Sequence, residues 1–193
     1  MITDNIVIIE KPQNISYERI QKLIHNAHSS NMVKGLVYGT ANQSVEQLKK
    51  TLEKDAICFV GMDGDKLVAT GTVEFRKRSL LFMNFEIACF GLFGVSPEYK
   101  GRNLGNRILD KRIEIASAKG YKYMYCSTAE ENTIVRHMYE KRGFVKVDYY
   151  KAPANNFYSI RYLKWEHNSK LLDFVVCLTY KVRRYYVRRA FKL

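Results

Sequence analysis

Hydrophobic and polar positions recur along this chain with two different periods, which together predict a mixed α/β domain. Apolar runs rich in β-branched and aromatic residues indicate strands, and apolar residues spaced three and four positions apart indicate helices. The expected strands span residues 6–10, 56–62, 66–75, 80–95, 121–127, 145–150 and 157–163. The expected helices span residues 14–24, 44–52, 104–119, 132–142 and 169–191. This order of elements predicts a mixed sheet with helices on its faces.

Local signals mark several ends of these elements. Asp-Gly-Asp at residues 63–65 predicts a tight hairpin between two strands. Ser44 followed by Gln47 predicts a capping box at the start of the second helix. Residues 31–42 are polar with scattered apolar positions, which fits a mobile loop over a site as well as an irregular linker.

The length of 193 residues predicts one domain, because a chain of this size can bury about 70% of its unfolded surface. We expect residues 1–166 to form that domain. We expect residues 167–193 to form a basic amphipathic helix that is packed on the domain or appended to it.

Cysteine usage indicates a reducing compartment. Cys58, Cys89, Cys126 and Cys177 are far apart, lie in apolar runs and form no CxxC pair, and no histidines cluster near them. We therefore expect buried thiols, with neither a disulfide nor a metal site. The first residues lack the basic region of a signal peptide, so we expect a cytoplasmic protein.

The formal net charge is +13, which favours an anionic ligand, an anionic membrane surface or nucleic acid. From residue 164 onward eight Lys and Arg face two acids, so this tail carries +6 of the charge. The tail fits a helix packed on the sheet or on a second subunit in a homodimer, and it also fits docking on an anionic membrane surface. A basic stripe without a recognised module gives nucleic-acid binding little support. Its nearly apolar run, residues 171–180, is half of the roughly 20 residues that a membrane span needs.

The segment 95–109 is the strongest candidate for a binding site. It joins an expected strand to an expected helix and contains Gly101 and Gly105, with Lys100, Arg102 and Arg107 around them. Glycines let successive backbone N–H groups point into one concavity at the positive end of a helix, which suits phosphate. The segment matches neither a P-loop nor a dinucleotide fingerprint, so a plain strand-to-helix turn is the alternative.

A second motif follows about thirty residues later. Asn132 begins a short helix, Tyr139 follows seven residues on, and the pair Gly143-Phe144 begins four residues beyond Tyr139. With these two motifs, over residues 95–144, the chain resembles the GNAT superfamily of acetyl-CoA-dependent N-acetyltransferases. The expected element order fits that family over about residues 5–164.

Three positions depart from the family pattern. Lys100 stands where Arg or Gln is usual, Asn103 where the middle glycine is usual, and Val135 where alanine is usual. Lysine keeps the positive charge, and asparagine tolerates left-handed geometry better than most residues other than glycine.

The resemblance implies a mostly antiparallel α/β (α+β) sheet that is splayed at a cofactor cleft. Acetyl-CoA would be the cosubstrate, without a metal. Free backbone groups of Phe93 and Val95 would bind the pantetheine arm, and Asn132 would hydrogen-bond it from the wall of the cleft. Lys100 would add charge beside the pyrophosphate, which would sit on the backbone amides of Gly101, Arg102, Asn103, Leu104, Gly105 and Asn106.

The resemblance also implies direct transfer of an acetyl group to a primary amine. Tyr139 would lie beside the thioester sulfur and protonate the leaving thiolate. Glu86 is our candidate base, with Glu74 in reserve, although Glu86 fits equally well a residue that faces solvent or pairs with the arginines near it. His25, His28 and His137 give no signal of a role.

The acceptor stays open. An amino sugar or another anionic small molecule would suit the basic chain, antibiotics and protein N-termini are further candidates, and a polyamine would suit it least. The alternative is a catalytically inactive GNAT-fold binding protein on a membrane surface or an anionic polymer.

Overall fold

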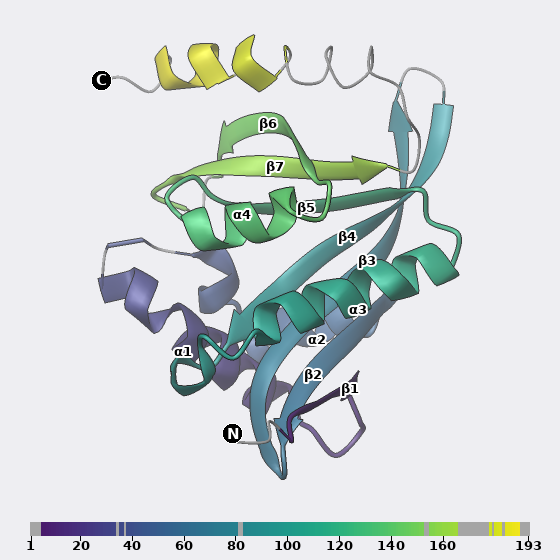
Figure 1. Cartoon of the computed structure of the whole chain (residues 1–193), viewed down its shortest axis with the longest axis vertical. Helices are drawn as coiled ribbons and strands as arrows, with labels where there is room; N and C mark the ends of the chain where they lie inside the picture. The colour runs from purple at the N-terminus through teal and green to yellow at the C-terminus, as the bar shows by residue number, and fades with distance from the viewer. Residues whose placement is uncertain are drawn as a thin grey trace.

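A computed structural model of the chain describes residues 5–33, 35–36, 38–80, 83–152, 155–165, 178, 180–182 and 184–189. Its centre is a seven-stranded sheet in the order β1-β2-β3-β4-β5-β7-β6 (Figure 1). The strands are β1 (Val7–Glu10), β2 (Ala56–Asp63), β3 (Lys66–Leu80), β4 (Met83–Val95), β5 (Tyr123–Ala129), β6 (Val145–Lys151) and β7 (Tyr158–Trp165). β4 and β5 are parallel and all other neighbours are antiparallel, which confirms the predicted mixed sheet.

The two faces of the sheet carry different helices. The helices are α1 (Tyr17–Val33), α2 (Val45–Leu52), α3 (Leu104–Ala118) and α4 (Thr133–Glu140), with short 3-10 turns η1 (Gly39–Asn42) and η2 (Pro97–Tyr99). In β2, Phe59 packs in a cluster with Ile108 of α3, whereas Val60 packs with Ile20 of α1 and Leu48 of α2. Successive side chains of a strand point to opposite faces, so α3 lies on one face and α1 and α2 on the other. Figure 1 shows α3 and α4 together on the near face.

Most predicted element ends agree with the structure. Ser44 and Gln47 form the expected capping box at the start of α2. The β2–β3 hairpin turns at Gly64, which has a φ of +55°. The segment 31–42 differs from a continuous loop or linker, because α1 runs on to Val33 and η1 is helical from Gly39. No glycine or proline interrupts α1 before Gly35, whose φ of +77° is typical of a residue just beyond a helix end.

Cys58, Cys89 and Cys126 are buried free thiols, and Cys177 lies outside the described residues. Within the described ranges, no group of three His, Cys, Asp or Glu residues is placed to hold a metal ion. None of the helices in the described part of the chain has the length and apolarity needed to cross a bilayer.

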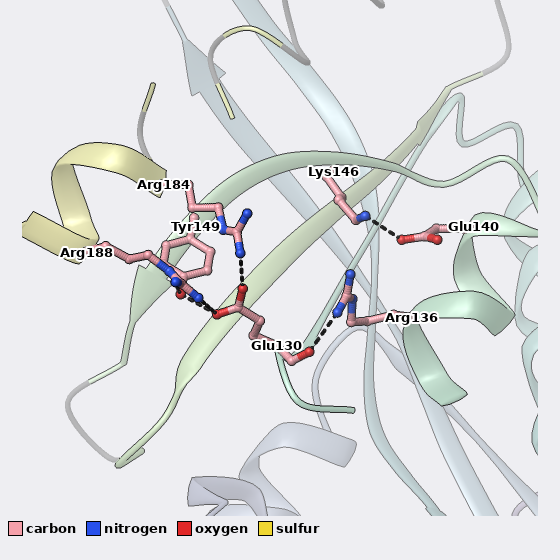
Figure 2. A network of polar contacts seen from close by, with 7 residues as sticks. All are labelled: Glu130, Arg136, Glu140, Lys146, Tyr149, Arg184 and Arg188. Carbon is pink, nitrogen blue, oxygen red and sulfur yellow. Dashed lines mark hydrogen bonds and ion pairs between the residues drawn. The ribbon is translucent and has the colours of Figure 1, made fainter. Parts of the chain in front are cut away.

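The C-terminal segment is helical at residues 178, 180–182 and 184–189 and lies beyond β6 (Figure 1). The rings of Tyr180 and Tyr149, a residue of β6, are 6.4 Å apart between centroids. Arg184 and Arg188 both bind the carboxylate of Glu130, which also accepts a hydrogen bond from the Tyr149 hydroxyl (Figure 2). The helix therefore directs basic side chains toward the domain. The expected boundary between residues 166 and 167 and the first part of the expected helix lie outside the described residues.

Candidate active site

The sheet opens into a fork between β4 and β5. The two strands pair in parallel only at Ile87–Tyr123, Ala88–Met124 and Cys89–Tyr125. Beyond Cys89, β4 continues to Val95 along β3 alone, and β5 continues along β7. The predicted splay is therefore present, and one edge of each strand faces the gap with backbone groups that no neighbouring strand uses.

A β-bulge shapes the β4 side of the fork. Thr72 of β3 pairs with Gly91, and Thr70 pairs with Gly94, so Leu92 and Phe93 together face a single β3 residue. Leu92 takes a φ of +43° and is buried. The expected bulge at one of the two glycines thus falls between them. It interrupts the ladder at Phe93, one of the two residues predicted to bind pantetheine.

The predicted phosphate turn forms the mouth of the fork at the start of α3. Gly101 has a φ of +82°, and Asn103 is left-handed with φ 61° and ψ 9°. Asn103 does not cap α3 with its side chain, and no described residue accepts a hydrogen bond from the backbone N–H groups of Leu104, Gly105 or Asn106. Free amides at the N-terminus of a helix favour an anion.

Gly105 serves close packing, unlike Gly101. A Cβ atom at Gly105 would lie 3.1 Å from Cζ of Phe93 and 3.5 Å from Sδ of Met138. The missing side chain therefore lets the first turn of α3 approach the bulge of β4 and the buried face of α4. Gly101 has nothing within 4 Å of its own Cβ position, so its glycine is required by conformation.

The charged side chains of the turn differ in their surroundings. Lys100 and Arg102 are exposed, and the Arg102 guanidinium lies 4.7 Å from the centroid of the Tyr99 ring. Arg107 is half-buried and donates a hydrogen bond of 2.6 Å to the carbonyl of Ile6, so it ties α3 to the residue before β1.

The Asn106 side chain is also engaged within the protein. Its amide nitrogen donates to the Asn103 side chain, and its oxygen accepts a hydrogen bond of 2.8 Å from Arg142. Arg142 binds Asp110 as well, which links α3 to the end of α4. Asn106 can therefore contribute its backbone N–H to an anion, whereas its side chain braces the turn.

Asn132 lies at the end of β5, on the other side of the fork. Its side-chain oxygen accepts a hydrogen bond of 3.2 Å from the Val135 amide and so caps α4. The Tyr38 hydroxyl lies beside the Asn132 side chain, and the Tyr38 ring contacts the rings of His28 and Phe157 at 4.6 Å each. These contacts bring α1 and the segment before η1 to the fork.

His28 of α1 is a site residue that the sequence did not reveal. Burial lowers its pKa, while the nearby backbone of Phe93 acts in the opposite direction and Lys100 lowers it further. A neutral imidazole at neutral pH can accept a proton. Nothing in the sequence near His28 signals this position, because only the tertiary fold brings α1 to the bulge of β4.

Tyr139 points from α4 into the core below the fork. It is 3% exposed, and its ring lies 5.5 Å from that of Tyr162 and 5.7 Å from that of Phe144. Burial raises the pKa of Tyr139, Cys126 raises it further, and Arg112 lowers it. The hydroxyl is therefore protonated at neutral pH and can act as a proton donor.

The two candidate carboxylates lie in different places. Glu86 precedes the three residues of β4 that pair with β5, its side chain is 61% exposed, and it lies 4.0 Å from Lys77. It is therefore at the opposite end of the paired segment from Asn132, and the structure does not bring it to the fork. Glu74 pairs across the sheet with Cys89, where the fork begins, and its side chain is 19% exposed beside Arg76.

The open sheet with a helix N-terminus at its mouth has the architecture of a GNAT acetyltransferase. The chain belongs to that family, because it matches the model of the acetyltransferase (GNAT) family over residues 24–144. Acetyl-CoA-dependent acetyl transfer is the general activity of this family.

Solved structures share the fold. One is the ribosomal-protein-S18-alanine N-acetyltransferase of Escherichia coli, with a TM-score of 0.62 and 14% identity over 86% of this chain and 97% of that one. Another is Arabidopsis thaliana NAA60 in complex with a bisubstrate analogue, with a TM-score of 0.62 and 13% identity over 83% of this chain and 100% of that one. A third is a GNAT family acetyltransferase of Elizabethkingia anophelis with acetyl-CoA bound, with a TM-score of 0.58 and 16% identity over 84% of this chain and 99% of that one. At these identities the likeness establishes the fold.

Proposed function

We propose that this protein transfers an acetyl group from acetyl-CoA to a primary amine, directly and without a covalent enzyme intermediate. The observation that carries the proposal is the fork itself, which joins a free helix N-terminus at its mouth to a buried tyrosine at its base. The spacing of these groups along one opening suits a long ligand with an anionic end and a reactive end.

The cofactor would lie along the fork. Its pyrophosphate would be held by the free amides at the start of α3, with Lys100 and Arg102 nearby. Its pantetheine arm would use the backbone of Phe93 and Val95 on one side and Asn132 on the other. These residues line both sides of the opening, which supports the assignment.

The chemistry would begin with attack of a neutral amine on the acetyl carbonyl carbon, which forms a C–N bond and an oxyanion. A strand amide near Val95 would stabilise the oxyanion. Collapse breaks the C–S bond, the sulfur keeps the electron pair, and Tyr139 gives its proton to the thiolate. The nitrogen loses one proton to a base or to water.

The proton acceptor can be chosen by position. His28 and Glu74 lie beside the fork, whereas Glu86 lies beyond the paired segment. We expect His28→Asn or Glu74→Gln to lower kcat at neutral pH, and Glu86→Gln to leave it within about twofold. A loss of activity confined to Glu86→Gln would instead support Glu86 as the base, as expected from the sequence.

The first test is binding. Calorimetric titration with acetyl-CoA should show saturable binding at sub-millimolar concentration, with CoA competing. No binding in that range would overturn the enzyme proposal and favour a GNAT fold that has lost catalysis. Asn103 already adopts the left-handed geometry that the turn needs, so the substitution of the usual glycine does not distort this site.

The second test identifies the acceptor by thiol release in a panel of amines. We expect amines that carry a phosphate or carboxylate, such as amino-sugar phosphates, to be better acceptors than polyamines, because the chain carries a net charge of +13. Peptide N-termini belong in the same panel. Preference for a polyamine would contradict the anionic acceptor while leaving acetyl transfer intact.

The C-terminal helix supports a membrane contact as a second role. Four apolar or aromatic side chains in its described part are about half exposed or more, namely Leu178, Val182, Tyr185 and Tyr186. Lys181 and Arg189 are exposed in the same helix, and mixed apolar and basic residues favour an anionic lipid surface. Vesicles with phosphatidylserine should co-sediment the full chain, and Tyr185→Ser/Tyr186→Ser should reduce this. Equal sedimentation of both proteins would contradict it, and a concentration-dependent dimer would indicate a second subunit instead.

A further inference from the structure

Arg112 of α3 is the most completely buried charged side chain among the described residues. It is 0% exposed and points into the sheet. Its guanidinium lies 5.0 Å from the centroid of the Phe90 ring and 5.1 Å from that of Phe93. A Cβ atom at Gly71 would lie 3.5 Å from its Cδ and Cζ atoms, so β3 leaves room for the arginine.

No carboxylate accounts for this buried charge. Within the described chain, none of the three guanidinium nitrogens has a hydrogen-bond partner of good geometry. The polar groups that act on it are the Tyr139 hydroxyl and the Cys126 thiol. Burying an unpaired cation is costly, and an apolar side chain of similar volume is often more stable in such a place. Fold stability therefore does not explain Arg112.

The position of Arg112 relative to the fork does offer an explanation. Phe90 directly follows Cys89, the last residue of β4 that pairs with β5, and Cys126 directly follows Tyr125, the last such residue of β5. The guanidinium therefore lies against the first residue of each separating strand. It sits at the apex of the fork, beside the hydroxyl of Tyr139.

We propose that Arg112 is a positioning residue that acts through Tyr139: its positive charge lies beside the hydroxyl at the apex and stabilises the negative charge left on the Tyr139 oxygen during the transfer. The inference rests on the proposed acetyl transfer. When the C–S bond breaks, the sulfur takes the electron pair and the Tyr139 proton moves to it, which leaves a phenolate. The positive guanidinium stabilises that phenolate until a proton returns from solvent.

The surroundings of Tyr139 agree with this role. Burial and Cys126 of β5 raise the pKa of Tyr139, and Arg112 of α3 is the group that lowers it. The Tyr139 ring also lies near the rings of Phe144 and of Tyr162 on β7, and the Tyr162 hydroxyl donates to Glu140. Without Arg112, proton transfer from Tyr139 to a thiolate would become more uphill.

The test uses Arg112→Met and Arg112→Lys in the full chain, with acetyl-CoA and the acceptor found by the amine panel. We expect Arg112→Met to keep or raise Tm, to change the Kd of acetyl-CoA by less than about threefold, and to lower kcat about 30-fold. Arg112→Lys should recover part of kcat, and Arg112→Met should add little to the loss caused by Tyr139→Phe.

Other outcomes would overturn the inference. A lower Tm with an unchanged kcat would show that Arg112 is structural. A loss of transfer from succinyl-CoA, with acetyl transfer unchanged, would show that Arg112 binds an acyl carboxylate. If wild type transfers acetyl groups and Tyr139→Phe is equally active, acetyl transfer stands and only the roles of Tyr139 and Arg112 fail. If wild type transfers nothing, the proposed function fails and this role fails with it.

Discussion

Arginines occur in two opposite settings in this molecule. Arg112 is enclosed at the apex of the fork and pairs with no carboxylate of the described residues, whereas Arg184 and Arg188 on the C-terminal helix share the carboxylate of Glu130 (Figure 2). Glu130 is 14% exposed and also accepts from the Tyr149 hydroxyl, and its backbone carbonyl accepts a hydrogen bond of 2.9 Å from Arg136.

The two settings have opposite effects on stability: the burial of Arg112 lowers the free energy of unfolding, whereas the contacts of Arg184 and Arg188 with Glu130 raise it. A carboxylate that accepts several charge-assisted hydrogen bonds holds its partners in place. A buried cation with no such partner keeps its full charge available to a neighbour in a medium of low dielectric constant. The Glu130 cluster, namely Glu130, Tyr149, Arg184 and Arg188, therefore fastens the C-terminal helix, and Arg112 acts on Tyr139.

The largest effect should follow from removing the hydroxyl on which Arg112 acts. Tyr139→Phe should lower kcat about 100-fold with little change in the Kd of acetyl-CoA, because only the proton donor is lost. Tyr162→Phe is the matched control, since its ring lies 5.5 Å from Tyr139 and its hydroxyl binds Glu140. Steady-state kinetics and calorimetry separate the two effects. A Tyr139→Phe protein with wild-type kcat at neutral pH would show that Tyr139 is not the proton donor and that Arg112 has no catalytic group to act on.

The next effect concerns the Glu130 cluster. Glu130→Ala should lower the free energy of unfolding by about 1–3 kcal/mol, because it leaves two arginines and a tyrosine without their acceptor. The control is Glu114→Ala, which removes an exposed ion pair with Lys111 and should cost less than about 0.5 kcal/mol. Urea unfolding measures both, and equal losses would mean that the cluster contributes no more than an ordinary surface pair.

Lowering the pH should cancel the contribution of Glu130 to the free energy of unfolding. Burial raises the pKa of Glu130, but hydrogen bonds from Tyr149, Arg188 and Arg184 outweigh it, so the folded pKa is lowered. A lowered folded pKa gives stability that is complete above the unfolded value, about 4.3, and is lost as the pH falls through the folded value. We expect the free energies of unfolding of wild type and Glu130→Gln to differ by about 1 kcal/mol at pH 6, and this difference to shrink as the pH falls below the unfolded pKa. A difference that grows on acidification would contradict the lowered pKa.

The smallest effect tests whether the two surface arginines share one partner. Arg184→Gln and Arg188→Gln should each lower the free energy of unfolding by about 0.5 kcal/mol, because the other arginine still neutralises Glu130. The double substitution should cost more than the sum, as expected for groups that substitute for each other. Additive losses in urea unfolding would show that the two contacts are independent.

The fold could be predicted further than the site. Apolar runs and turn residues predicted the order of strands and helices along the chain, the capping box at Ser44 and the left-handed tolerance of Asn103, since each depends on neighbours in sequence. Which strands lie next to each other in the sheet, and how deeply each site residue is buried, depend on tertiary packing. His28 and Glu86 show this, because their places relative to the fork are decided by where α1 packs and where the β4–β5 pairing stops.

Arg112 is a different case, because the sequence did contain a signal. It follows Ile108 by four residues and precedes Ala116 by four, so helical spacing puts it on the apolar face of α3. A charged residue at such a position is usually assumed to reach solvent along its own stem. The structure shows that this one turns inward between two phenylalanine rings.

The short β4–β5 pairing has a mechanical consequence. The sheet consists of two plates, β1 to β4 and β5 to β7, joined along a seam of three residue pairs. Backbone hydrogen bonds over so short a seam resist bending weakly, so the angle between the plates is set by side chains that cross it, such as the Phe90–Phe144 contact at 6.0 Å. We therefore expect the volume of the core residues at this seam to affect the width of the opening.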